Sequence, residues 1–155
     1  MIVRPARDRD ADAIWSIIGP TIRAGETYAY DPAITEAEAQ RVWIELPAAI
    51  YVAVDEAGML LGTYYIKPNQ PGLGAHVCNC GYIVAAAARG QGIASRLCEH
   101  SQDEARRLGF RAMQFNLVVS TNTGAVRLWQ QLGFPIVGTL PGAFNHPRLG
   151  MWTRM

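Results

Sequence analysis

The clearest chemical pattern in this sequence is a short glycine-containing segment that follows a run of apolar residues. The apolar run ends in Tyr82-Ile83-Val84, and a series of alanines separates it from the segment. The segment consists of Arg89, Gly90, Gln91, Gly92, Ile93 and Ala94. A helix that begins at the second glycine would present unpaired backbone N–H groups at the positive end of its dipole. Glycine lets a phosphate approach that backbone closely, so we predict a pyrophosphate site at residues 89–94.

Two common phosphate-binding motifs do not fit this segment. It lacks the Gly-Lys-Ser/Thr of a Walker loop and the Gly-x-Gly-x-x-Gly spacing of a dinucleotide fold. The segment resembles the Gln/Arg-x-x-Gly-x-Gly/Ala signature of the GCN5-related N-acetyltransferases, with Arg89, Gly92 and Ala94 in the defining places. The stretch from Asn122 to Leu132-Gly133-Phe134 is similar to the next segment of that family. The resemblance covers the whole chain and is strongest over residues 81–134.

The resemblance implies acetyl-CoA as cosubstrate and no metal. It places the pantetheine arm where the strand of Tyr82, Ile83 and Val84 separates from its neighbour, paired like an added strand. Residues 89–94 would hold the pyrophosphate, and Asn122 would bond the arm. A neutral amine would attack the thioester carbonyl, and a backbone N–H near Ile83 or Val84 would stabilise the negative oxygen.

The sequence departs from the family pattern at Trp129, where a tyrosine commonly protonates the leaving thiolate. An indole N–H does not act as an acid at neutral pH. Another group or water would then supply the proton, or the thiolate would leave without one. Tyr82 is a weak substitute, since packing in the core is the simpler role for it.

Three residues are predicted to serve the acceptor amine: Glu26, Asn79 and His146. Glu26 lies in a loop that walls the acceptor site in the phosphinothricin and small-amino-acid branch of the family. A carboxylate there could attract a cationic amine and relay its proton through water. Asn79 lies on the strand of the thioester and could bond a carboxylate or carbonyl. His146, in a predicted loop, and His76 are alternative bases, although solvated or structural roles fit both histidines.

Three functions remain open from the sequence. The first is N-acetylation of a small primary amine, such as an amino acid or an amino-acid analogue, which the aromatic loop Tyr28-Ala29-Tyr30 favours because it suggests a closed pocket. The second is acetylation of protein N-termini or lysines. The third is a coenzyme A-binding sensor module without catalysis, which the tryptophan at position 129 keeps possible.

Composition narrows the class of protein. The 155 residues carry a formal net charge of +1, with Lys67 as the single lysine, so we predict neither a nucleic-acid partner nor a membrane surface. No apolar run is long enough to span a bilayer and no signal peptide is evident, so we expect a cytoplasmic protein. The three cysteines fit buried thiols. A homodimer is possible, with an apolar edge formed by Met151, Trp152 and Met155.

The pattern of apolar residues predicts one α/β domain over residues 1–155. Its mixed, mostly antiparallel central sheet would have about six or seven strands and carry helices on both faces. The family resemblance implies that this sheet splays at the cosubstrate strand. Strands are expected at residues 2–6, 50–54, 59–67, 75–84, 112–119, 136–138 and 150–154. Helices are expected after Asp8 or Asp10, from the capping box at Thr35 to about residue 46, over 92–108, and from Thr121 or Thr123 to 132. Gly19-Pro20 is expected to break or bend the first helix.

Overall fold

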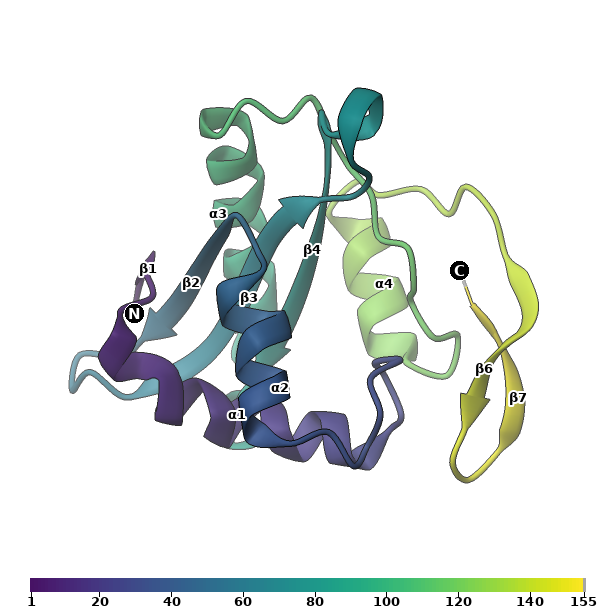
Figure 1. Ribbon diagram of the computed structural model, residues 1–155, viewed down its shortest axis with the longest axis horizontal. Helices are drawn as coiled ribbons and strands as arrows, with labels where there is room; N and C mark the ends of the chain where they lie inside the picture. Colours follow the sequence, from purple (N-terminus) through teal and green to yellow (C-terminus); the bar gives the residue numbers. More distant parts are fainter. Residues whose placement is uncertain (155) are drawn as a thin grey trace. The chain divides into compact units, whose positions relative to one another are not determined.

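The structure is a computed structural model that describes residues 1–154, with side chains through residue 151. The chain forms two compact units, one of residues Met1–Gly19 and Thr35–Gln114 and the other of Pro20–Ile34 and Phe115–Met155. The strands are β1 Ile2–Pro5, β2 Ala49–Val54, β3 Leu60–Pro68, β4 Val77–Val84, β5 Ala112–Met113, β6 Leu140–His146 and β7 Gly150–Arg154. The α-helices are α1 Ala11–Ala24, α2 Glu36–Gln40, α3 Ile93–Arg107 and α4 Thr123–Gln131 (Figure 1). Short 3-10 turns and a π-helical turn at Arg41–Glu45 complete the chain.

The first unit is built on a five-stranded sheet in the order β1-β2-β3-β4-β5. The pairs from β1 to β4 are antiparallel, while β5 lies parallel to β4 over two residue pairs. Val52, Ala53 and Ile66 are fully buried, as expected for strands that are covered on both faces. The β2–β3 turn closes with the Asp55 carboxylate accepting the Met59 N–H at 2.8 Å.

Helix α3 covers one face of this sheet, and three tyrosines in register meet it. Tyr51, Tyr64 and Tyr82 stack across β2, β3 and β4, with ring centroids 4.9 and 5.6 Å apart. Each hydroxyl is engaged by a polar side chain of α3. The pairs are Tyr51 with Glu104 at 2.5 Å, Tyr64 with His100 at 2.7 Å and Tyr82 with Ser101 at 2.7 Å. This ladder fixes the position of α3 along the strands.

The opposite face carries α2 and the π-helical turn that continues it (Figure 1). The capping box predicted at Thr35 is confirmed, since its hydroxyl accepts the Glu38 N–H and the Glu38 carboxylate accepts the Thr35 N–H. Trp43, fully buried, donates its indole N–H to Thr63 at 3.4 Å and meets the Tyr65 ring edge-on at 4.8 Å. Neighbouring residues of β3 therefore point to different faces of the sheet, Tyr64 toward α3 and Tyr65 toward the π-helical turn.

The second unit contains the end of α1, the loop that follows it, α4 and the β6–β7 hairpin. Phe115 joins this unit's aromatic side chains, with ring centroids 5.0 Å from Trp129 and 4.7 Å from Phe134. Asn122 caps α4, because its side-chain oxygen accepts the Ala125 N–H at 3.3 Å.

The predicted α/β class is confirmed, and several details of the predicted elements were wrong. Helix α1 continues through Pro20 to Ala24, because Ile14, Ile18 and Ile22 keep one buried stripe along it. The strand expected at 112–119 pairs only over Ala112–Met113, and residues 136–138 form no strand. His146 was expected in a loop and lies at the end of β6. Strands β6 and β7 form a separate two-stranded sheet, so the central sheet has five strands instead of six or seven.

Candidate functional site

Strand β4 has one paired edge and one edge that opens. Along β3 it pairs over its whole length, from Pro68 opposite Cys78 to Gly62 opposite Val84. On the other side, within residues 1–154, pairing with β5 ends at Cys78, whose carbonyl accepts the Gln114 N–H at 2.8 Å. The strands therefore separate beyond residue 78, which is the splay predicted from the sequence. The remaining length of β4 leaves a backbone edge of six residues.

The direction of the backbone groups along this edge follows from the register. The Val77 carbonyl accepts the Asn69 N–H of the β3 side, and Ala85 donates to Leu61, so odd-numbered residues pair with β3. The backbone groups of Cys80, Tyr82 and Val84 consequently point to the edge that β5 leaves. Ile83 turns its N–H to β3, and of the two donors named from the sequence only Val84 directs its N–H to the open edge.

The glycine segment lies at the end of β4 and begins α3. Gly90 and Gly92 have φ of 76° and 75°, and a Cβ added at either would have no atom within 4 Å. The i to i−4 hydrogen bonds of the helix begin at Arg96, whose N–H donates to the Gly92 carbonyl at 3.2 Å. The N–H groups of the preceding turn have no acceptor within the helix. Arg89 is exposed beside them, while Ile93 is buried under the segment.

These features test whether the segment fits a pyrophosphate. The two glycines carry no side chain in the space above the helix start, and a Cβ at either position would project into that space. Helix α3 has 15 residues, which gives its N-terminus a full dipole. The side chain of Gln91 folds back to the Ala87 carbonyl at 3.2 Å and so leaves the space clear. The residues present fit a bound anion.

The second family motif begins at Asn122, in the second unit, where two polar side chains could meet a ligand. Asn122 uses its side-chain oxygen for the α4 cap, so its NH2 group is what it can offer to a ligand. Two residues earlier, the Ser120 hydroxyl is buried and has no hydrogen-bond partner among the described residues. A buried hydroxyl without a partner is costly, which makes it a group suited to a ligand. The sequence reasoning missed Ser120, because nothing in its spacing predicts burial.

The structure brings Glu26 and His146 into one group through Arg148. The Glu26 carboxylate pairs with the Arg148 guanidinium at 2.6 Å, and His146 Nδ1 accepts the Arg148 backbone N–H at 3.2 Å. His146 is 4% exposed, while the Arg148 side chain is 74% exposed. With Nδ1 as acceptor, the neutral imidazole carries its proton on Nε2 and is a hydrogen-bond donor. Acting as a base through Nδ1 would require His146 to release this bond.

Asn79 and His76 lie in the first unit. The Asn79 amide donates to the Gln114 carbonyl at 2.8 Å, just where β4 and β5 separate, and its side chain is on the face opposite α3. His76 is exposed, with Nδ1 3.0 Å from the Leu73 carbonyl. Asn79 thus links β4 to the segment after β5 at the point where the two strands separate. Glu26 and His146 belong to the other unit.

The comparisons with known proteins agree with this geometry. A family model described as "Acetyltransferase (GNAT) family" matches residues 14–134. The chain belongs to the GNAT acetyltransferase family. The N-acetyltransferase aca1 of Schizosaccharomyces pombe is 34% identical over 137 residues, 79% of this chain and 66% of that protein, so the chain spans slightly less than two thirds of this relative.

Two solved structures show how well the fold is shared. A GCN5-related N-acetyltransferase from Kribbella flavida is 48% identical, with a TM-score of 0.93 over 99% of this chain and 93% of that one. A phosphinothricin acetyltransferase from Sinorhizobium meliloti, solved with acetyl-CoA, is 22% identical, with a TM-score of 0.85 over 99% of this chain and 84% of that one. The GNAT fold expected from the two motifs is confirmed.

Within this GNAT fold, the buried thiols and Tyr82 form part of the core. Cys78, Cys80 and Cys98 are buried and free. Burial raises the pKa of the Cys98 thiol and raises the pKa of Tyr82 well above its ordinary value. The Tyr82 hydroxyl lies 2.7 Å from Ser101 under α3. These contacts give Tyr82 a packing role on the α3 face.

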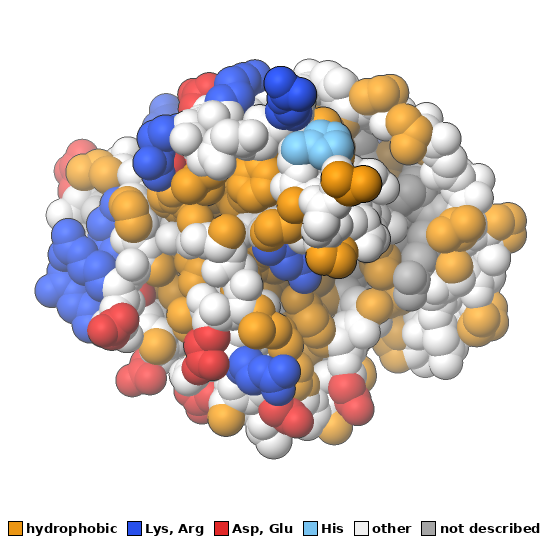
Figure 2. Space-filling model, turned by 45° about the horizontal axis from the view of Figure 1, so that its top comes forward, with side chains coloured by type: hydrophobic (Ala, Val, Ile, Leu, Met, Phe, Trp, Pro, Cys, Tyr) orange, Lys and Arg blue, Asp and Glu red, His pale blue; other side chains and the backbone are white. Residues whose placement is uncertain are grey.

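The surface of this GNAT chain is mixed in charge. The face drawn in Figure 2 carries both basic and acidic side chains, with apolar ones among them. In the described part of the chain, no helix has the length and apolarity that crossing a membrane requires.

Proposed function

We propose that this protein is an acetyl-CoA-dependent N-acetyltransferase that acts on a small primary amine, an amino acid or an amino-acid analogue. The observation that carries the proposal is that the first unit contains both an open β4 edge and, at the start of α3, a glycine turn without side chains above it. The edge offers the N–H and C=O groups of Cys80, Tyr82 and Val84 to an extended arm, and the turn offers N–H groups to a pyrophosphate. Acetyl-CoA combines both features in one molecule and supplies a thioester open to nucleophilic attack.

The chain's own residues would then divide the work. The Val84 N–H would donate to the thioester oxygen and stabilise the charge that develops there. Gly90 and Gly92 would leave room for the pyrophosphate, and Arg89 would add a positive charge. The family resemblance implies that Asn122 would bond the arm, and Ser120 has a buried hydroxyl that could accept or donate to a ligand.

The ion pair of Glu26 and Arg148 supports an amino-acid acceptor. An α-amino acid carries an ammonium and a carboxylate, and it can replace each partner of the pair with a group of the same charge. Arg148 would bind the carboxylate in a bidentate manner, and Glu26 would bind the ammonium and accept its proton through water. The stacked rings of Tyr28 and Tyr30, 5.8 Å apart, belong to the same loop and would form an apolar wall. Asn79 would bond a carbonyl or carboxylate of the acceptor.

Purified protein tests the proposal directly, by acetyl-CoA calorimetry and by thiol release with a panel of amines. The matched acceptors are amino acids and the same amines without their carboxylate. We expect turnover with amino acids, a raised KM for them in Arg148→Met, and little change for simple amines. Thiol release only with peptide N-termini or lysine peptides would instead favour a protein acetyltransferase. Acetyl-CoA binding without turnover on any amine would favour a sensor module.

The proposed role of Glu26 has its own measurement. Glu26→Gln should lower turnover most at pH values below the pKa of the acceptor amine and leave acetyl-CoA affinity unchanged, because the carboxylate accepts a proton only from the ammonium form. Superimposable pH–rate profiles of wild type and Glu26→Gln would remove Glu26 from the mechanism. His146 would then be the next base to test.

We also propose a homodimer that uses the β6–β7 hairpin. Exposed apolar side chains gather in this part of the chain, at Val137, Leu140, Leu149 and Met151. Met155 and the Trp152 side chain, which were predicted to contribute, lie outside the described part. A monomer mass in light scattering at micromolar concentration would contradict the dimer.

A further inference from the structure

A transferred acetyl group leaves a thiolate behind, and α4 offers no acid for it. Trp129 stands where the GNAT pattern commonly has tyrosine, and an indole N–H does not release a proton at neutral pH. The departing sulfur would lie at the open edge of β4. A proton donor that serves it must therefore reach this edge from a neighbouring element.

Tyr65 is such a group, because its ring lies across β4. It is the cross-strand partner of Gly81. A Cβ added at Gly81 would lie 2.6 Å from Tyr65 Cε1, 2.8 Å from Cζ and 2.9 Å from the hydroxyl oxygen. These distances are too short for any side chain, so Gly81 is the residue that allows the phenol to lie over β4. The ring starts on β3 and ends above the strand that carries the open edge.

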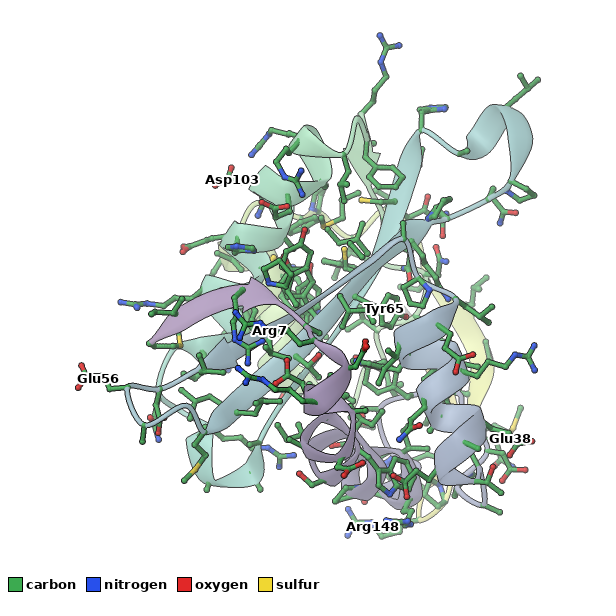
Figure 3. All side chains as sticks on the ribbon, turned by 60° about the vertical axis from the view of Figure 1, so that its left-hand side comes forward. Arg7, Glu38, Glu56, Tyr65, Asp103 and Arg148 are labelled. Atoms are coloured by element: carbon green, nitrogen blue, oxygen red, sulfur yellow. The ribbon has the colours of Figure 1, made fainter. Side chains whose placement is uncertain are left out.

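The phenol is held in this position from two sides. The Trp43 indole meets its ring at 87° and 4.8 Å, and Tyr65 is only 5% exposed. Figure 3 shows Tyr65 on the side of the sheet that carries α2. The Lys67 ammonium lies 5.2 Å from the ring centroid. A positive charge at this distance stabilises the negative charge that a donated proton leaves on the phenol oxygen. Gly81 itself lies between Cys80 and Tyr82, whose backbone groups point to the open edge.

We infer that Tyr65 is the proton donor to the departing thiolate, an inference that rests on the proposed acetyl transfer. As the amine nitrogen bonds to the acetyl carbon, the carbon–sulfur bond breaks and sulfur leaves with the electron pair. The Tyr65 hydroxyl gives its proton to that sulfur. The attacking nitrogen releases one proton, which returns through water to the phenolate. The sum is one amide and one free thiol, with no further reactant.

A neighbour on the same strand supplies the matched control. Tyr64 is also a buried tyrosine, but it faces α3, and its hydroxyl lies 2.7 Å from His100 Nδ1. Removing the Tyr64 hydroxyl therefore alters the opposite face of the sheet. Tyr64→Phe should leave the open edge as it is.

The test uses coenzyme A itself, because a group that donates to sulfur must discriminate thiolate from thiol. Calorimetry would measure coenzyme A and acetyl-CoA binding to wild type, Tyr65→Phe and Tyr64→Phe at about pH 7 and about pH 9.2, on either side of a typical thiol pKa of about 8.5. We expect Tyr65→Phe to bind coenzyme A about tenfold more weakly at the higher pH, the effect of one lost hydrogen bond to a charged group. Its affinities for acetyl-CoA and for coenzyme A at about pH 7 should change by less than about twofold.

A second variant moves the phenol without removing it. Gly81→Ala places a Cβ against the ring and should cause the same selective loss. Should either variant fail to fold, the other carries the test. Equal pH dependence of coenzyme A affinity in wild type and a folded variant would overturn the inference, as would the same loss in Tyr64→Phe. Failure of wild type to bind acetyl-CoA at any pH would instead refute the proposed function.

Discussion

The pyrophosphate site can be tested by filling the space above Gly92. Gly92→Val adds a side chain at φ of 75°, where no protein atom lies within 4 Å of the new Cβ. The cost to folding is then backbone strain alone, about 1–2 kcal/mol, which a domain with a typical stability of about 5–15 kcal/mol tolerates. The side chain would instead occupy the position of the phosphate.

The effect on binding is larger than the effect on folding. Losing two N–H bonds to a charged phosphate, each worth about 1.5–3 kcal/mol, costs about 3–6 kcal/mol. Each 1.4 kcal/mol corresponds to about tenfold, so acetyl-CoA should bind at least about a hundredfold more weakly. Calorimetry measures the affinity, and urea unfolding measures the cost to stability.

Gly109 at the other end of α3 provides the control. Its φ is 87°, and a Cβ there also meets no atom within 4 Å. A helix of 15 residues places it about 22 Å away from Gly92. Gly109→Val should show a similar loss of stability and normal binding. If acetyl-CoA affinity in Gly92→Val equals that in Gly109→Val, the phosphate site lies elsewhere.

Two further predictions concern groups outside this site. Hydrogen bonds from Arg4 at 2.6 and 2.9 Å hold the pKa of the Asp10 carboxyl below its ordinary 3.8. This stabilisation is present above about pH 4 and is lost as pH falls through the lowered pKa, so Asp10→Asn should lower the free energy of unfolding by about 2 kcal/mol at pH 7 and by less at lower pH. Urea unfolding that shows the same deficit from about pH 7 down to the most acidic pH at which the protein stays folded would contradict this. Trp129→Phe should reduce turnover by less than about tenfold, about 1.4 kcal/mol, because an aromatic ring remains beside Phe115 and the indole N–H is not an acid at neutral pH. A several-hundredfold loss in a saturating rate assay would show a direct role for the indole.

The elements with local signals were predictable. The β2–β3 hairpin, α3 and the capping box at Thr35 follow from alternation, helical spacing and cap chemistry, which depend on neighbours in the sequence. The first helix was different, because Pro20 argues locally for a break while buried Ile18 and Ile22 keep the helix in place. The β6–β7 hairpin was half missed, since the residues up to His146 are typical of a loop and form a strand only by pairing with residues that follow them.

The sequence by itself determined the family and the glycine segment that we propose binds phosphate, because glycines at a helix start act through their own backbone and need no distant partner. Only the tertiary structure decided which groups meet across strands and loops. The register of β3 on β4 turned the Ile83 N–H away from the open edge and laid Tyr65 over Gly81. The fold of the second unit brought Glu26 into an ion pair with Arg148, although 122 positions separate the two residues in the sequence. Contacts of this kind arise from strand pairing and packing between distant segments, which residue spacing does not encode.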